Sequence, residues 1–207
     1  MVIGFIGDSI TFGVGASKPE YCYVNRVKQA LGCEVVNYGI SGTRIARQTR
    51  ISENHQWDMD FNLRLDFVDS RLDKLFVFGG TNDFGHGRTP FGEKGDTSVY
   101  TFHGALDTMC RTLIEKLGKE KIVFIIPIKR ADTDCGINSY TGKRWKDYVD
   151  VINYYVDKYG FKKLDLFSAL PIPPFEESEY FIDGLHPNDK GYSVIAEKIC
   201  EFIKNDK

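Results

Sequence analysis

The sequence predicts a doubly wound α/β fold with a parallel sheet, and three observations support this prediction. Short apolar runs recur along the chain, stretches of helical periodicity separate them, and this alternation continues to the C-terminal end. Buried parallel strands have this run length, and the connections between them need helical crossovers. The 207 residues with 42% hydrophobic content can bury one sizeable core. We therefore expect a single domain over residues 1–207.

The first expected strand is the apolar run Val2–Ile6. A helix is expected over Tyr23–Leu31, because four of its apolar side chains can share one face at helical spacing. Two further short apolar runs, Glu34–Asn37 and Leu75–Phe78, are the next expected strands.

In the second half of the chain, a helix is expected from about Thr101 to Leu117, where Gly118 is a suitable C-cap. The strand Lys121–Ile126 follows. A helix near Lys143–Tyr159 is closed by Gly160, and Phe161–Leu164 is a weaker strand. The last helix runs from about Asn188 to Ile203, with Asn188 as its N-cap.

No repeat, low-complexity tract or flexible linker divides the chain. The stretch from Gly79 to Ser98 is long and rich in glycine, and because long loops of this kind are often functional, we expect it to border a site. The segment Pro171–Pro174 is interpreted as a rigid loop within the domain.

The charge and composition of the chain limit the classes of molecule that it is expected to bind. The chain carries 27 basic and 29 acidic residues, so no positive field favours nucleic acid or anionic lipid, and a neutral or weakly charged small substrate is expected. No apolar stretch approaches the roughly 20 residues of a membrane span. The five cysteines have no metal-ligand spacing and are interpreted as free thiols of a reducing compartment: Cys22, Cys33, Cys110, Cys135 and Cys200. We expect a cytoplasmic protein, with a trimmed secreted precursor as the alternative.

Ser9 is the first candidate for chemistry. It lies in Gly7-Asp8-Ser9-Ile10-Thr11, directly after the first expected strand. The carboxyl edge of a parallel sheet is where open α/β folds bind ligands, so a nucleophile there is well placed. The alternative is that Asp8 or Ser9 only caps the next turn or helix.

A carboxylate and a histidine stand together near the other end of the chain, in Asp183-Gly184-Leu185-His186-Pro187. A histidine can accept the proton of a serine, and a neighbouring carboxylate can fix its tautomer and stabilise the imidazolium. The alternative is an Asx turn that leads into the last helix, with His186 as an incidental loop residue.

Two more loops follow strands on the same edge. Asn82 lies in Gly79-Gly80-Thr81-Asn82-Asp83 and can donate its amide hydrogens to an oxyanion, although a local Asx turn is the alternative. Gly42 lies in Gly39-Ile40-Ser41-Gly42 and can offer a backbone N–H to the same oxyanion, or it is only a turn glycine. Three strand ends and one C-terminal loop thus supply a nucleophile, two oxyanion donors, a base and its carboxylate.

In this order, and without the Gly-x-Ser-x-Gly elbow of the α/β-hydrolases, these motifs resemble the SGNH (GDSL) hydrolase family. Its four blocks of Ser, Gly, Asn and His match Ser9, Gly42, Asn82 and the pair Asp183 and His186. The resemblance implies a flavodoxin-like three-layer α/β/α sandwich with a five-stranded parallel sheet. It also implies a serine esterase without metal or cofactor, in which Ser9, Asp183 and His186 are catalytic and Ser9, Gly42 and Asn82 form the oxyanion hole.

The other charged, histidine and aromatic residues near these motifs are mostly assigned structural or surface roles. Asp8 and Asp83 receive structural roles in their loops. His86 and His103 flank the Gly79–Ser98 stretch and can line a substrate pocket, but an ordinary packing or surface role is favoured for both. Arg44 and Arg130 are interpreted as solvated charges. Five aromatic residues can line a sugar or acyl site, although at least half of them are expected in the core: Trp57, Phe84, Tyr100, Tyr140 and Trp145.

The leading function is hydrolysis of small carboxylic esters such as O-acetyl groups on carbohydrates, because no long apolar segment indicates a fatty-acyl groove. A lysophospholipase or thioesterase of the same fold is the alternative within this chemistry. A non-catalytic carbohydrate-binding module and an acyltransferase remain open as other classes. The sequence leaves the oligomeric state and the mobility of the Gly79–Ser98 stretch undecided.

Overall fold

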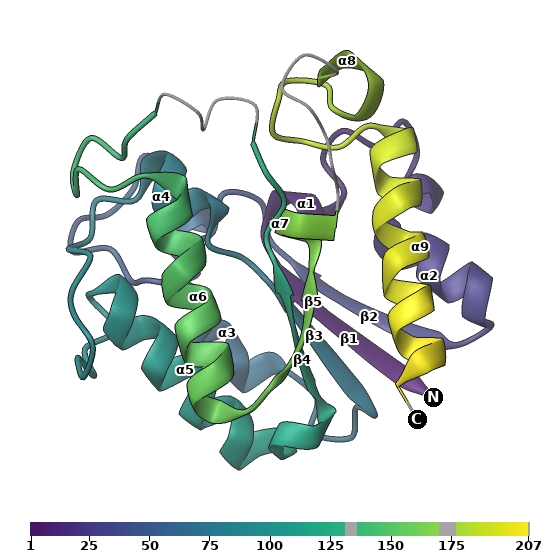
Figure 1. Cartoon of the computed structure of the whole chain (residues 1–207), viewed down its shortest axis with the longest axis horizontal. Helices are drawn as coiled ribbons and strands as arrows, with labels where there is room; N and C mark the ends of the chain where they lie inside the picture. The colour runs from purple at the N-terminus through teal and green to yellow at the C-terminus, as the bar shows by residue number, and fades with distance from the viewer. Residues whose placement is uncertain (131–135, 170–176, 207) are drawn as a thin grey trace.

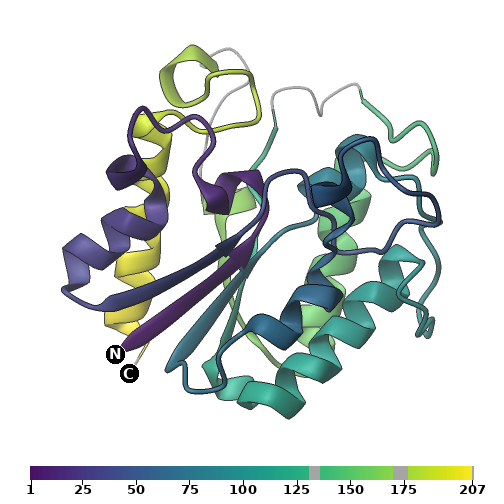
Figure 2. The same cartoon turned by 180° about the vertical axis from the view of Figure 1, so that it is seen from behind.

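The fold is a five-stranded parallel sheet between two layers of helices (Figures 1 and 2). The computed structural model describes residues 1–130, 136–169 and 177–206. Its strands are β1 (Val2–Gly7), β2 (Glu34–Gly39), β3 (Lys74–Phe78), β4 (Ile122–Ile126) and β5 (Lys162–Asp165). They lie in the order β2-β1-β3-β4-β5. The chain therefore proceeds from β1 toward one side of the sheet to form β2, and toward the other side to form β3, β4 and β5. All five predicted strands are confirmed, with ends shifted by one or two residues.

The long helices are those that the periodicity predicts: α2 (Tyr23–Leu31), α5 (Phe102–Leu117), α6 (Trp145–Tyr159) and α9 (Asp189–Asn205). Gly32, Gly118 and Gly160 follow the first three, and each has a positive φ that an L side chain rarely adopts. The side chain of Asn188 accepts from the N–H groups of Lys190 and Gly191, so the predicted N-cap is confirmed.

Several short helices lie in the connections: α1 (Ser9–Phe12), α3 (Phe61–Arg64), α4 (Thr81–His86), α7 (Leu166–Ala169) and α8 (Glu177–Tyr180). Short 3-10 helices cover Pro19–Tyr21, His55–Asp58, Leu65–Phe67 and Lys119–Lys121. The Gly79–Ser98 stretch is therefore not a loop throughout, because α4 occupies its first part. Pro171–Pro174 lies outside the described residues.

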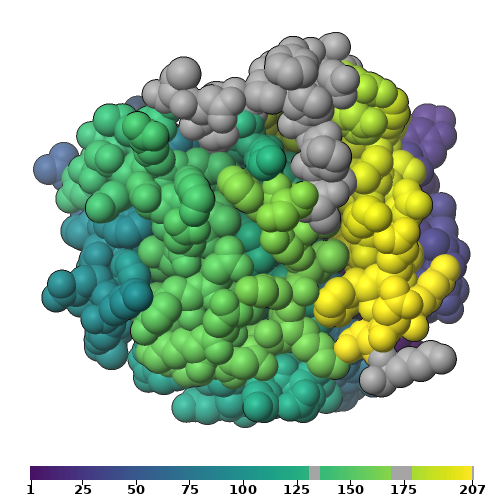
Figure 3. All heavy atoms as spheres, viewed as in Figure 1, coloured from purple at the N-terminus to yellow at the C-terminus, as the bar shows by residue number. Residues whose placement is uncertain are grey.

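The strands divide their side chains between two cores. Ile3 and Phe5 of β1 join the cluster under α2 and α9, whereas Ile6 joins the cluster under α3, α5 and α6. The same alternation separates Phe76 from Val77 on β3. Because successive strand residues point to opposite faces, continuous apolar runs are what a sheet covered on both faces requires. Figure 3 shows the β5 edge of the molecule, with α6 and α9 on either side of it.

The carboxyl ends of β1, β2 and β3 meet at one edge of the sheet, below α1 and α4. Asn37 joins two of the connections there, because its amide donates to Thr11 O at 2.8 Å and its Oδ1 accepts from Gly39 N–H. Within the described residues, no helix is both long and apolar enough to cross a membrane. The four described cysteines are buried free thiols, and Cys135 lies outside the described residues.

Candidate active site

Ser9 is the first residue of α1, directly after β1. Asp8 is the N-cap of this helix, and its Oδ1 accepts from Ile10 N–H at 3.0 Å. Gly13 ends the helix in the left-handed region with φ 106° and donates to Ser9 O. The N-cap Asp8 and the terminating Gly13 therefore limit α1 to a single turn directly after β1. Ser9 is only 3% exposed in this turn.

Asp183 and His186 lie in a tight loop closed by the bridge between Phe181 and Pro187. Asp183 Oδ1 accepts from His186 N–H at 2.7 Å and from Leu185 N–H at 3.0 Å. The Asx turn that the sequence offered as an alternative is thus present, and it is what aims both side chains. Burial opposes ionisation of Asp183, but hydrogen bonds from His186 and Leu185 outweigh it and lower the pKa of the carboxyl.

The loop brings His186 to Ser9, which is 177 residues away in sequence. His186 Nε2 lies 2.9 Å from Ser9 Oγ, and its Nδ1 lies 2.7 Å from Asp183 Oδ2. An ionised carboxylate can only accept, so Nδ1 carries the proton and Nε2 accepts from the serine hydroxyl. The geometry joins the three predicted residues into one hydrogen-bonded chain.

Asn82 lies in α4, after β3, with 6% of its surface exposed. Its Nδ2 donates to Thr43 O at 3.0 Å, which ties it to the loop of Gly42. Gly42 has φ 78°, and a Cβ there would stand 2.1 Å from Cδ1 of Trp57. Both the backbone conformation and the indole therefore require glycine at this position.

His86, which sequence reasoning set aside, contacts Asn82 across one turn of α4. Its Nε2 lies 3.2 Å from Asn82 Oδ1, and Arg44 Nη1 lies 3.4 Å from its Nδ1. Arginine can only donate, so Nδ1 accepts and Nε2–H donates to the amide oxygen. Burial, together with the charges of Arg44 and Arg130, lowers the pKa of His86 to about 4 and keeps it neutral. The i, i+4 spacing to Asn82 was the available signal in the sequence.

The prediction that Arg44 and Arg130 are solvated charges is wrong. Arg44 is 4% exposed and bonds Asp58, Ser52 and the backbone of Trp57. Arg130 is 8% exposed, donates to Thr81 O at 2.9 Å and lies over the ring of Phe84. Buried carbonyls and carboxylates supply the partners that water would otherwise provide, and no local pattern reveals this.

The buried Arg64 was also missed. It donates to Tyr38 O at 2.6 Å and to Thr43 Oγ1 at 2.9 Å, and its guanidinium lies over Phe61. These hydrogen bonds hold the loop that contains Gly42 in place. Burial raises the pKa of the nearby Asp8 to about 6, although the hydrogen bond from Ile10 and the charge of Arg64 oppose this.

Asp83 has the structural role that the sequence suggested. Its two oxygens accept from Ile45 N–H and Ala46 N–H, both at 2.9 Å, so it fastens α4 to the segment after Gly42. Burial raises its pKa to about 7 despite these bonds. His103 is also an ordinary packing residue, which contacts Tyr155 and Phe91.

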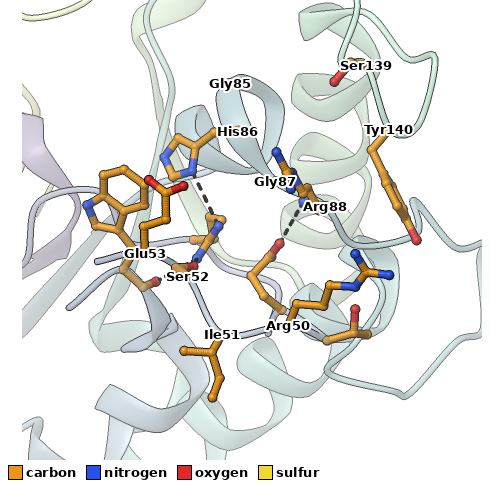
Figure 4. A pocket seen from close by; sticks show the side chains of 14 residues that line it. Arg50, Ile51, Ser52, Glu53, Gly85, His86, Gly87, Arg88, Ser139 and Tyr140 are labelled. Atoms are coloured by element: carbon orange, nitrogen blue, oxygen red, sulfur yellow. Dashed lines mark hydrogen bonds between the residues drawn. The ribbon is translucent and has the colours of Figure 1, made fainter. Parts of the chain in front are cut away.

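A cavity of about 760 Å³ lies next to the two side chains that contact Gly42 and Asn82, and Figure 4 shows the residues that line it. Trp57 and His86 line it, and their rings lie 4.9 Å apart. Tyr140 lines it as well, whereas Phe84 and Trp145 are buried in the core and Tyr100 lies exposed beside Arg47. Of the five candidate aromatics, two therefore line a cavity.

Comparisons with known proteins agree with this architecture. The chain matches the model of the GDSL-like Lipase/Acylhydrolase family over residues 5–194. A solved protein from Lactobacillus plantarum is 28% identical, with a TM-score of 0.81 over 98% of this chain and 96% of that one. A lipase/acylhydrolase from Enterococcus faecalis is 23% identical, with a TM-score of 0.65 over 99% and 95%.

An acetyl xylan esterase has the same fold at 20% identity, with a TM-score of 0.70 over 98% of this chain and all of that one. The comparison with curated proteins finds no match. The family match covers every motif on which the resemblance was argued, and the five-stranded parallel sheet between helices is the predicted fold. The chain therefore belongs to the GDSL-like Lipase/Acylhydrolase family.

Proposed function

We propose that this protein is a serine esterase that hydrolyses small carboxylic esters, and that O-acetylated carbohydrates are its substrate class. The observation that carries the proposal is the chain from Ser9 Oγ through His186 to Asp183, with steps of 2.9 and 2.7 Å. Membership of an acylhydrolase family supports the reaction type. The fold shared with an acetyl xylan esterase suggests the substrate class.

In the first half of the reaction, His186 Nε2 takes the proton of Ser9 as Oγ attacks the acyl carbon. The carbonyl electrons move to the oxygen, which accepts hydrogen bonds from the N–H groups of Ser9 and Gly42 and from the amide of Asn82. Asp183 stabilises the imidazolium. His186 then gives the proton to the leaving alcohol oxygen as the C–O bond breaks, which leaves an acyl group on Ser9.

In the second half, His186 removes a proton from a water molecule that attacks the acyl carbon. The tetrahedral adduct collapses, the carboxylic acid leaves, and Ser9 regains its proton from His186. His86 acts as a positioning residue, because its bond to Asn82 Oδ1 fixes the side of the amide that carries the hydrogens. One of these hydrogens is committed to Thr43 O, which leaves the other for the oxyanion.

Hydrolysis of p-nitrophenyl esters of increasing chain length tests the proposal. We expect the highest kcat/KM with acetate or butyrate and no turnover by Ser9→Ala. A preference for chains of eight or more carbons would favour the lysophospholipase or thioesterase alternative. Product analysis with a sugar acceptor separates hydrolysis from acyl transfer, because a transferase forms an acylated sugar instead of free acid.

A further inference from the structure

We infer that the cavity beside Asn82 binds the sugar part of the substrate, and that this sugar ring carries a carboxylate. The inference rests on the proposed esterase function and specifies its substrate. The cavity has the size of small-molecule sites, which range over roughly 300–1,000 Å³.

The cavity shares two side chains with the candidate site. Trp57 covers Gly42 so closely that no Cβ fits between them, and His86 bonds Asn82. Only the side chains of Trp57 and His86 therefore lie between a group in the cavity and the predicted oxyanion donors Gly42 and Asn82. A substrate can occupy both places if its ester is attached directly to the group that fills the cavity.

The walls suit a sugar ring. Trp57 and Tyr140 offer aromatic faces, which pack against the C–H faces of sugars, and Tyr140 is 53% exposed. Apart from Ile51 and the charged residues, the other lining side chains are polar and can donate to and accept from hydroxyl groups: Gln48, Thr49, Ser52 and Ser139. A long acyl chain would find little apolar surface among these groups.

The positive charge of the cavity lining favours an anionic ligand. Among the described residues, three arginines and one carboxylate, Glu53, line the cavity, although the whole chain has a net charge of −2. Arg44 is already paired with Asp58. Arg50 and Arg88 are exposed, and within the described part of the chain their guanidinium groups make no hydrogen bond or ion pair. Guanidinium groups bind carboxylates and phosphates in forked geometry.

Glu53 favours a carboxylate over a phosphate. Glu53 also lines the cavity, and in Figure 4 Arg50 extends toward Tyr140. A ring bound in the cavity meets the positive groups of Arg50 and Arg88 and the negative group of Glu53. A singly charged carboxylate is attracted to the arginines with less repulsion from Glu53 than a doubly charged phosphate ester.

The test compares three substrates that carry one O-acetyl group at the same position of the ring. They are the methyl glucuronoside, the methyl glucoside and the methyl glucoside 6-phosphate. We expect the wild-type protein to prefer the glucuronoside over the glucoside by about tenfold in kcat/KM, as one charge-assisted contact provides. The double variant Arg50→Ala/Arg88→Ala should lose this preference and keep its rate on p-nitrophenyl acetate. Tyr140→Ala should lower kcat/KM on both sugar esters, again without effect on p-nitrophenyl acetate.

The control removes two arginines elsewhere, as Arg71→Ala/Arg111→Ala, since both are exposed and pair with Asp69 and Asp107. It should keep the preference for the glucuronoside. Equal rates on glucuronoside and glucoside in the wild type would overturn the inference, and a preference for the phosphate would assign the cavity to phosphosugars instead. In both cases hydrolysis of p-nitrophenyl acetate shows that the esterase itself is intact.

Calorimetric titration of the wild-type protein with D-glucuronate and D-glucose gives a readout that needs no turnover. Binding of glucuronate that the double variant loses supports the cavity assignment, even if the protein hydrolyses no ester. Absence of glucuronate binding to the wild type would overturn it.

Discussion

Replacement of Asn82 by alanine tests the proposed oxyanion hole most sharply. The variant removes the amide that donates to Thr43 O at 3.0 Å and accepts from His86 at 3.2 Å. Loss of one oxyanion donor typically lowers kcat by about 10²- to 10³-fold, equivalent to roughly 3–4 kcal/mol of transition-state stabilisation. KM should change little, because the donor acts on charge that develops only in the transition state.

The same substitution also affects folding, so a stability measurement must accompany the kinetics. Thr43 O and His86 Nε2 both lose a partner in a buried region, which costs about 1–3 kcal/mol each in the free energy of unfolding. Urea unfolding monitored by circular dichroism measures this loss. Kinetics are then taken under conditions in which the variant is fully folded.

Asn62→Ala is the matched control. Asn62 Nδ2 donates to Ile45 O and Ala105 O, so its removal also breaks side-chain to backbone bonds, and no contact joins it to Ser9 or His186. We expect a loss of stability with kcat within about threefold of the wild type. If folded Asn82→Ala also retains kcat within that range on p-nitrophenyl acetate, the assignment of Asn82 is refuted.

Three further predictions follow from the site. His86→Ala should lower kcat roughly five- to tenfold at constant KM, which is the effect of one hydrogen bond on Asn82. His86→Gln should restore most of this activity, because the glutamine amide can donate in place of the imidazole. An equal loss of kcat in both variants would argue against a positioning role for His86. Asp183→Asn should lower kcat by up to about 10⁴-fold, since an amide no longer fixes the His186 tautomer; steady-state kinetics that stay near wild type would contradict this role. Burial raises the pKa of Asp83 to about 7, above an unfolded value near ~3.9, so the stability from its protonated form is present at low pH and is lost as the pH rises to 7. Urea unfolding from pH 4 to 8 should show this decline, with at most about 1.4 kcal/mol per pH unit from Asp83, and Asp83→Asn should reduce it to the part that the raised pKa of Asp8 causes.

The strands and long helices were predictable because their signals are local. Apolar run length marks the covered strands, and the glycine after Leu31, Leu117 and Tyr159 marks where each helix ends. The helix α4 was not predictable in the same way. Its residues Thr81–His86 include glycine and turn formers, and it is held by tertiary bonds such as those from Ile45 and Ala46 to Asp83.

The candidate site follows the same division. Ser9, Gly42 and Asn82 could be located from their places after strands, because parallel strands bring their carboxyl ends together, and Asp183 and His186 from their spacing in one loop. The supporting arginines could not. Arg44 and Arg64 are buried only because distant carbonyl and carboxylate oxygens converge on them. A single sequence records the arginine but not the partners that replace water.

Reaction of the protein with a fluorophosphonate at neutral pH tests the central claim, that Ser9 is a nucleophile activated by His186. Intact mass and peptide mapping measure the adduct. We predict one phosphonylated residue, Ser9, with no adduct in Ser9→Ala and labelling slowed at least about 10²-fold in His186→Ala. A folded wild-type protein that remains unlabelled would contradict the account and favour a non-catalytic binding module. Labelling at another residue would contradict it as well, because the nucleophile would then not be Ser9.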